Sequence, residues 1–314
     1  MRLIIRIMLS ITKKRGAGRL AVLPLLLLCG MAWSADNSMP LTMEGGTARA
    51  MAMGSAAVGL PQGSASLLWN PAGLADMQKM EVGLHHNSGL GDLISEDFVM
   101  GVPLGALGGF AVSMNYLTNG TFAGRNSVGA LTGDYTPAEF GISAGWGSRL
   151  ASNLSAGAAL KLNYQNLSIN SYSALAVDLG LLWNPCYRFS LGVTYSNLGT
   201  AVAGSLLDSG WRIGVSYGLN DSVILAVSGE LKPSAYNRMQ SGIECFITPG
   251  VALRAGYVIN FQSINFDSLN GLTAGLGLNI SKDMTVDYAY LPYGDLGVSH
   301  RLSATWKFGE VVKR

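Results

Sequence analysis

The stretch Ser299–Phe308, "SHRLSATWKF", alternates between polar and apolar side chains at every residue from Arg301 onward. The apolar positions are Leu302, Ala304, Trp306 and Phe308, and the polar positions are Arg301, Ser303, Thr305 and Lys307. Successive side chains of a β-strand point to opposite faces of a sheet. The stretch therefore predicts a strand with one apolar face and one charged face.

The same period of two residues recurs along most of the chain, for example at 110–116 and 223–230. It predicts fourteen strands, near residues 79–87, 95–103, 107–117, 138–149, 153–168, 171–184, 187–197, 210–219, 221–232, 237–247, 250–260, 271–280, 283–290 and 299–308. After residue 34, no stretch approaches the 18 uninterrupted apolar residues that indicate a membrane-spanning helix. The positive mean hydropathy of +0.30 must therefore reside in strands.

The connections between the predicted strands alternate in length. Short turns follow the even-numbered strands, whereas long loops follow the third, seventh, eleventh and thirteenth. Short turns on one rim and long loops on the other are typical of outer-membrane barrels. The sequence thus predicts an all-β, 14-stranded antiparallel transmembrane outer-membrane β-barrel over residues 79–308. A soluble β-protein is the alternative, because alternation alone does not show whether the apolar face meets lipid or a second sheet.

Residues 1–34 have the pattern of a secretory signal peptide, with six basic residues ahead of the apolar run "LAVLPLLLLCG". We expect cleavage before Ala35. An uncleaved anchor is the weaker alternative, because the run is shorter than the roughly 20 residues of a spanning helix. The whole chain has 21 Lys and Arg against 19 Asp and Glu, so removal of the signal leaves a net negative protein. No basic face remains for a nucleic-acid partner.

Nine charged residues fall on the polar faces of the predicted strands and are expected to face the lumen. They are Lys161, Asp178, Arg212, Glu230, Glu244, Arg254, Asp287, Arg301 and Lys307. Both signs are present, whereas an ion-selective pore would more naturally show a ring of one sign. The mixture predicts ion pairs across a narrow or filled lumen, because unpaired charges away from water are costly. A stabilising polar layer without a substrate role is the simpler interpretation.

A helix-start signal precedes the strands in the stretch 66–75, "SLLWNPAGLA". Asn70 is a strong N-cap residue, and Pro71 suits the first helical position. The pair predicts a short helix from Pro71 to about Met77, with Asn70→Asp and Asn70→Ser expected to be mild changes. Residues 35–78 contribute no strand and carry little charge, so we expect them to fold inside the barrel, at the short-turn rim, as a hatch or plug.

Three stretches resemble one protein family. The segment "ARAMAMGSAAVGLPQGSASLLWNPAGLA" resembles the N-terminal signature of the PorV/PorQ (UPF0164-type) outer-membrane proteins, which are related to FadL-type fatty-acid channels. The segments "GIECFITPGVALRAGY" and "DYAYLPYGDLGVSHRLSATWKF" are similar to hairpins of that family. The resemblance implies a FadL-like barrel with an N-terminal hatch, in which Asn70, Pro71 and Ala72 form the hatch motif. It also implies that a role in type IX secretion, as a shuttle or attachment partner, is open to the chain.

Two features depart from the family pattern. The chain is shorter than typical fatty-acid channels, which leaves small loops for capturing a ligand. It also continues beyond Phe308 through a C-terminal extension, residues 309–314, whereas such barrels commonly end on an aromatic residue.

Catalysis and cofactor binding find little support. The neighbours His85 and His86 fall on opposite faces of one strand, so they cannot act on one site. No cluster has metal-ligand spacing, and no cofactor is expected. Cys186 and Cys245 are the mature cysteines, which we expect to be free and half-buried, although a disulfide is permitted in an oxidising periplasm. The chain is therefore not expected to be an enzyme.

Two functions in the bacterial outer membrane remain. The first is binding or passage of a small hydrophobic molecule through a hatch-gated lumen surrounded by outer-membrane lipid. The alternative is docking of a secreted or envelope protein on the long-loop rim around residues 118–137. An apolar path beside the hatch would favour transport, whereas a sealed lumen with apolar loop tips would favour docking.

Overall fold

The computed structural model describes residues 46–167, 170–200, 207–232, 237–261 and 271–312. The expected signal peptide and the first part of the expected hatch, residues 35–45, lie outside the described residues. Within the described residues, no helix combines the length and the apolar character needed to cross a membrane.

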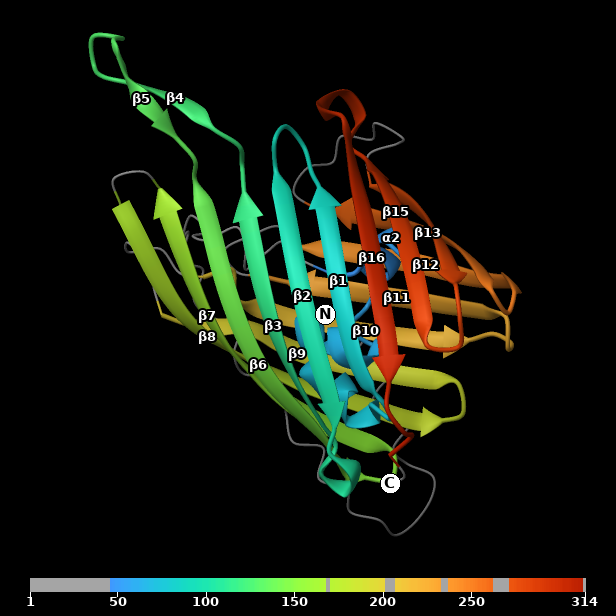
Figure 1. Cartoon of the computed structure of the whole chain (residues 1–314). Coiled ribbons are helices and arrows are strands. Elements are labelled where there is room, and N and C mark those ends of the chain that lie inside the picture. The colour runs from blue at the N-terminus through green and yellow to red at the C-terminus, as the bar shows by residue number, and fades with distance from the viewer. Residues whose placement is uncertain (1–45, 168–169, 201–206, 233–236, 262–270, 313–314) are drawn as a thin grey trace, which may run out of the picture. The chain divides into compact units, whose positions relative to one another are not determined.

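Fourteen antiparallel strands form a closed barrel (Figure 1). Each strand pairs with the barrel strands before and after it in sequence, β3 pairs with β6, and β1 closes on β16. The strands are β1 (Met80–Ser88), β2 (Ile94–Pro103), β3 (Gly109–Thr118), β6 (Ala138–Ala151), β7 (Leu154–Leu167), β8 (Asn170–Cys186), β9 (Phe189–Gly199), β10 (Gly210–Gly218), β11 (Val223–Leu231), β12 (Arg238–Thr248), β13 (Val251–Asn260), β14 (Leu272–Asn279), β15 (Met284–Pro292) and β16 (Val298–Phe308). The predicted 14-stranded barrel is confirmed. Each strand lies within a few residues of its predicted range.

One hairpin was not predicted. Strands β4 (Phe122–Arg125) and β5 (Leu131–Tyr135) pair with each other between β3 and β6 and extend beyond the rim of the barrel (Figure 1). The Asn126 side chain shapes the turn by accepting hydrogen bonds from the backbone N–H groups of Val128 and Ala130. Because almost every side chain of this hairpin is exposed, its sequence lacks the alternation of a half-buried strand.

The outer face of the barrel is apolar and carries two rows of aromatic side chains. On the loop side, Tyr116, Phe140 and Tyr164 are direct cross-strand neighbours on β3, β6 and β7. Toward the short turns, Phe110 and Trp146 pair on β3 and β6 in the same way. Aromatic girdles that bound an apolar outer band are typical of transmembrane barrels, because these rings favour the level of the lipid headgroups.

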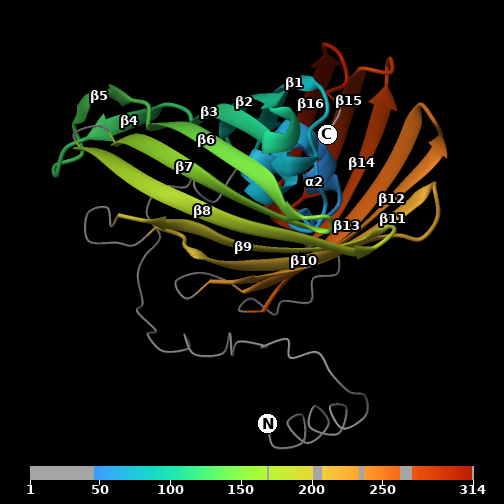
Figure 2. The same cartoon turned by 90° about the horizontal axis from the view of Figure 1, so that it is seen from below.

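The described chain before β1 folds into short helices enclosed by the strands (Figure 2). These are α2 (Ala48–Ala52), η2 (Gly63–Leu68) and η3 (Pro71–Asp76), the last two being 3-10 helices. We call residues 46–79 the plug segment. Most of its side chains are buried, and it packs against β1–β3, β6–β8 and β13–β16. At the other end of the chain, the N–H of Val312 donates to the carbonyl of Gln78 over 2.9 Å, so the C-terminal extension lies against the end of the plug segment.

Candidate functional site: the interface between plug and wall

Asn70 organises the last helix of the plug segment. Its Oδ1 accepts a hydrogen bond from the N–H of Ala72 at 3.1 Å, and Pro71 occupies the first helical position. The helix is of the 3-10 type and ends at Asp76, close to its expected end at Met77. The hatch motif therefore forms a capped helix start, as N-cap and proline preferences favour.

Asn70 also makes two contacts that its sequence pattern did not indicate. Its Nδ2 donates to the carbonyl of Val58, within the plug segment, and to the carbonyl of Leu181 on β8, each at 3.0 Å. The side chain thus caps a helix, braces the plug segment internally and ties it to the wall. Only an amide can make all three bonds, since it has both an acceptor and two N–H donors.

Glycines of the wall make room for this part of the plug segment. Gly147, Gly157 and Gly180 are cross-strand neighbours on β6, β7 and β8. A Cβ added to Gly157 would lie 2.5 Å from the backbone N of Ala72, and one added to Gly180 would overlap the Asn70 side chain. No larger residue fits here without moving the plug segment.

The same close approach recurs around the rest of the barrel. Added Cβ atoms would overlap plug atoms at ten wall glycines, which we call the glycine belt: Gly101, Gly109, Gly145, Gly147, Gly157, Gly180, Gly192, Gly242, Gly256 and Gly275. Gly242 and Gly256 face each other on β12 and β13, and both contact the backbone around Met53 and Gly54. The belt lets the backbones of plug and wall pack directly against each other.

Hydrogen bonds between plug and wall reach several separate strands. The N–H of Ala48 donates to Ser303 Oγ on β16 over 2.8 Å, and the N–H of Ser64 donates to Glu81 Oε2 on β1 over 2.7 Å. Ser216 Oγ on β10 donates to the carbonyl of Gly59 over 2.8 Å. The plug segment is therefore held at points distributed around the wall and not on one side alone.

The strongest tie is an ion pair. Arg49 donates from Nε and Nη2, one edge of its guanidinium, to both oxygens of Glu244 on β12, with Nε–Oε1 at 2.9 Å and Nη2–Oε2 at 2.5 Å. Glu244 is fully buried and also accepts from Arg254 Nε on β13 over 2.7 Å, while Arg254 Nη1 donates to Asp287 on β15 over 2.7 Å. Four charges of alternating sign thus connect plug and wall. Bidentate bonds of this kind are among the strongest side-chain interactions.

The structure buries most of the nine charged residues predicted to face the lumen. Buried are Asp178, Arg212, Glu230, Glu244, Arg254, Asp287 and Arg301, whereas Lys161 is half-buried and Lys307 is exposed. The expectation of pairs across the lumen is wrong. Lys161–Asp178 at 2.6 Å and Arg212–Glu230 at 3.4 Å join neighbouring strands, and Lys307 approaches Glu81 at 3.4 Å across the β1–β16 seam. Strands one or two places apart lie closer together than opposite walls, so these charges pair along the wall, while Glu244 also pairs with Arg49 of the plug segment.

Several residues of these ion pairs and plug contacts were not predicted from the sequence. Lys232 pairs with Asp208 and lies 3.4 Å from Glu230, and Glu81 faces the plug segment. Lys232 shares the strand face of Glu230 two positions later, which could have indicated its place. Arg49 is the one charged residue between positions 45 and 75, a signal that could have singled it out.

The histidines and cysteines considered for catalysis or metal binding lie at separate places in the structure. His85 is buried and His86 exposed, on opposite faces of β1. Cys186 and Cys245 are free thiols, and Cys186 is exposed where half-burial was expected, because it ends β8 at a tight turn. Among the described residues no group of three His, Cys, Asp or Glu side chains could hold a metal ion.

Comparison with known proteins finds similar folds among solved structures. No protein-family model and no curated protein sequence matches the chain. Solved structures do: the toluene transporter TbuX of Ralstonia pickettii has a TM-score of 0.60 at 14% identity, over 87% of this chain and 100% of that one. The Pseudomonas putida toluene transporter TodX gives 0.60 at 13%, over 85% and 99%, and a Pseudomonas aeruginosa FadL homologue gives 0.56 at 13%, over 84% and 98%. The chain thus has the fold of the FadL-like outer-membrane barrels.

Proposed function

We propose that this chain resides in the bacterial outer membrane and binds or passes a small hydrophobic molecule through a lumen gated by its plug segment. The observation that carries the proposal is the construction of the plug. It lies inside the barrel as a separate segment and is held to the wall by individual polar ties to β1, β10, β12 and β16. The similarity of fold to toluene transporters supports the same function.

The proposal includes the division of the chain. Residues 1–34 are the signal peptide, 35–78 the hatch, 79–308 the barrel and 309–314 the C-terminal extension. It also includes kinship with the PorV/PorQ proteins, which rests on the resemblance of the segments around Asn70 and at the end of the chain. Catalysis has no part in the proposal, and the neighbouring structures are transport proteins.

A second candidate function rests on the β4–β5 hairpin. Its tip exposes Val128 and Leu131, whose exposed fractions are 84% and 67%, and Phe122 stacks on Tyr135 with ring centroids 5.7 Å apart. Exposed apolar side chains at the end of a projecting hairpin are suited to contact another protein. This favours docking of a secreted or envelope protein on the long-loop rim.

Uptake of toluene into proteoliposomes tests the two functions against each other. One variant replaces residues 122–135 with a short Gly-Ser turn, and a second, Asn70→Ala, loosens the plug segment. A transport barrel should give protein-dependent uptake that the hairpin variant retains and Asn70→Ala alters. Absence of protein-dependent uptake, combined with loss of a co-purifying envelope protein from the hairpin variant, would replace transport by docking.

A further inference from the structure

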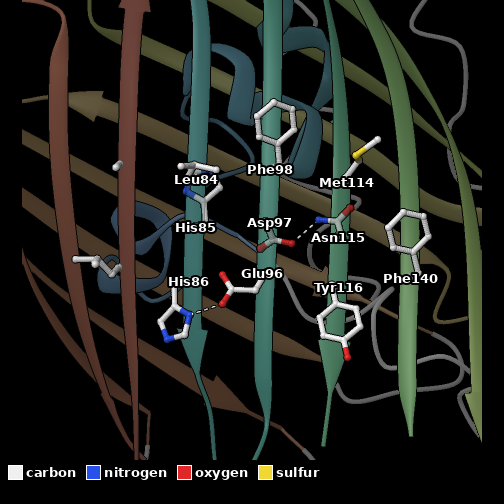
Figure 3. A pocket seen from close by; sticks show the side chains of 12 residues that line it. Leu84, His85, His86, Glu96, Asp97, Phe98, Met114, Asn115, Tyr116 and Phe140 are labelled. Carbon is white, nitrogen blue, oxygen red and sulfur yellow. Dashed lines mark hydrogen bonds and ion pairs between the residues drawn. The ribbon is translucent and has the colours of Figure 1, made fainter. Parts of the chain in front are cut away.

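Three side chains with catalytic chemistry share the outer face of β1 and β2. His86 and Ser88 are both exposed and are separated by the buried Asn87, so they lie on the same face of β1. His86 Nδ1 lies 2.7 Å from Glu96 Oε1 on the adjacent strand (Figure 3). His85 points to the other face and takes no part. A serine, an imidazole and a carboxylate therefore lie together on the outside of the wall, away from the plug segment.

The contact with Glu96 determines which ring nitrogen of His86 carries the proton. An ionised carboxylate only accepts hydrogen bonds, so the neutral imidazole holds its proton on Nδ1 and leaves Nε2 as an acceptor. No described residue hydrogen-bonds to Nε2 or to the Ser88 hydroxyl. A neutral histidine that a carboxylate fixes in one tautomer is what a general base requires. Glu96 is thus a positioning residue for His86.

Ser88 is placed to act as the nucleophile. It follows His86 by two residues on the same face, a rise of roughly 6–7 Å along the strand. Figure 3 shows the imidazole ring pointing along β1 away from Leu84, and therefore toward the position of Ser88. Rotation of the unengaged Ser88 side chain brings its hydroxyl to Nε2. Catalytic hydrogen bonds of this kind often tighten only when the substrate is bound.

An N–H donor lies on the other side of Ser88. His300 on β16 is the direct strand partner of Ser88, and its Nδ1 is 2.7 Å from the hydroxyl of Tyr288 on β15. When Tyr288 donates to Nδ1, the neutral His300 carries its own N–H on Nε2. Histidine side chains are among the donors that stabilise the oxyanion of acyl transfer. The arrangement works with both imidazoles neutral.

An apolar groove beside His86 and Glu96 has room for an acyl chain. It encloses about 500 Å³ over β1, β2, β3, β6 and β16. Glu96 is the direct strand partner of Tyr116, so the His86–Glu96 pair lies at the aromatic row on the loop side, the level of the lipid headgroups. Two residues nearer the middle of the membrane, the lining is formed by Leu84, Phe98 and Met114. A lipid ester at this boundary has its carbonyl near Ser88 and its chain in the groove.

We propose that this site hydrolyses an ester-linked acyl chain of an outer-leaflet lipid. Ser88 Oγ attacks the carbonyl carbon while His86 Nε2 takes the hydroxyl proton, and the Nε2–H of His300 stabilises the oxyanion. The ester C–O bond then breaks, and His86 returns the proton to the departing alcohol oxygen. The acyl group is left on Ser88 Oγ.

Water completes the cycle. His86 Nε2 takes a proton from a water molecule, whose oxygen attacks the acyl carbon. The bond from that carbon to Ser88 Oγ breaks, and His86 returns the proton to Ser88. One ester and one water thus give one carboxylic acid and one alcohol, so no oxidant, metal or cofactor is consumed.

Fatty-acid release from two lipids tests the activity and distinguishes its source of ester. Purified protein in mixed micelles receives either lipopolysaccharide or phosphatidylethanolamine, and the released acid is measured by mass spectrometry. Release from lipopolysaccharide would identify the outer-leaflet glycolipid as the substrate, and release from phosphatidylethanolamine alone would identify a phospholipid ester. Ser88→Ala and His86→Gln should each lower the rate about 10²–10⁴-fold. The double variant should be no slower than either, because the two residues act as a unit.

Ser173→Ala is the matched control. Ser173 is exposed on the outer face of β8 and is the strand partner of Tyr164, so it lies at the same aromatic row. Ser171 and Leu175 are its neighbours on that face, so no histidine stands beside it along the strand. The control should retain the full rate. Faster gel migration without boiling establishes that each variant is folded.

Two further substitutions separate positioning from structure. Glu96→Gln should lower kcat with little change in KM, and Glu96→Asp, which keeps a carboxylate, should restore part of the rate. His300→Phe should lower kcat about 10²–10³-fold, as loss of one oxyanion donor does, whereas His300→Gln keeps an N–H donor and should retain more activity. A structural role alone would not produce these differences between paired variants.

A fluorophosphonate probe gives a readout that does not depend on the lipid. It should label Ser88 Oγ with loss of fluoride in the wild type and leave Ser88 unlabelled in His86→Gln. Absence of both fatty-acid release and labelling in the folded wild type would overturn the proposal, as would an unchanged rate in Ser88→Ala. Toluene uptake should be the same in Ser88→Ala and the wild type, so the fate of this proposal is separate from that of transport through the lumen.

Discussion

Arg49 of the plug segment and Glu244 of β12 are 195 residues apart in sequence and form a two-point ion pair whose carboxylate is fully buried. Glu244 keeps a second cationic partner, Arg254, at 2.7 Å. The pair therefore does more to hold the plug segment than to neutralise Glu244. Loss of the Arg49 side chain should therefore affect the position of the plug segment more than the charge balance at Glu244.

Arg49→Ala should loosen the plug segment while leaving the barrel intact. Breaking a buried ion pair costs about 3–5 kcal/mol when it leaves a charge alone, and the retained Arg254 should reduce this to about 1–3 kcal/mol. Limited proteolysis of the plug segment in membranes measures the effect. Arg149→Ala is the control, because it removes a plug contact, with Asp76 at 2.8 Å, whose arginine is half exposed. Surface pairs contribute roughly 0–1 kcal/mol, so equal protease sensitivity of the two variants would contradict the assignment of Arg49 as the main tie.

Gly157→Ala should displace the plug segment. The new methyl group would lie 2.5 Å from the backbone N of Ala72 in the folded protein, a distance that only backbone movement can relieve. Gly229→Ala places the same group on β11 with its nearest neighbour at 3.9 Å, so it should be tolerated. Yield of heat-modifiable barrel and protease sensitivity of residues 46–79 are the measurements. If both alanines behave alike, steric fit of the belt is not what holds the plug.

Asn70 gives a prediction that differs from the one its sequence suggested. A capping role alone makes Asn70→Asp and Asn70→Ser mild. In the structure Nδ2 also donates to the carbonyls of Val58 and Leu181, and neither Asp nor Ser can replace both bonds. Asn70→Asp should be at least as damaging as Asn70→Ala, because it places a carboxylate against two carbonyl oxygens. We expect a loss of about 2–3 kcal/mol from the cap and the two hydrogen bonds together, read as protease sensitivity of the plug segment. If the Asn70→Asp variant is mild, the hydrogen bond from Asn70 Nδ2 to the carbonyl of Leu181 contributes little to the stability of the plug segment.

The mature protein should migrate faster on a gel when it is not boiled. A closed barrel has no free strand edge from which to unravel, so it resists detergent at room temperature. The β1–β16 ladder that closes this barrel pairs nine residues on each side. A protein that lacks residues 46–79 should show whether the wall alone keeps this resistance. Unchanged mobility of the intact, membrane-inserted protein would argue against the closed barrel.

The strands could be predicted from the sequence because each has one apolar face. The alternation in Ser299–Phe308 fixes both the presence of β16 and the faces of its side chains, and similar patterns fix the others. The β4–β5 hairpin escaped prediction because neither of its faces is buried, so no period of two was selected. Sequence patterns thus reported burial more directly than they reported strand formation.

The plug and its ties were predicted only in part. The cap at Asn70 is local, since its partner Ala72 is two residues away, and local chemistry can be read from sequence. The bond from Asn70 to Leu181 and the pair of Arg49 with Glu244 span more than 100 residues, and they depend on where the plug lies inside the closed wall. Glycines within strands usually indicate weakness or a bend. That they gather in two stretches of the wall, on β2, β3 and β6–β9 and again on β12–β14, becomes visible only once the strand register is known.

The glycine belt also constrains the order of assembly. Where glycines take the place of side chains, a wall that closed without the plug would leave empty space beside those strands, and empty space in a protein interior is destabilising. The plug segment ends where β1 begins, and β1 pairs with β16, the last of the barrel strands among the described residues. The seam that closes the barrel therefore joins the strand attached to the plug to the barrel strand most distant from it in the described sequence. β1 thus carries the plug segment and also forms the seam, so the place of the plug and the closure of the wall are both set at one strand.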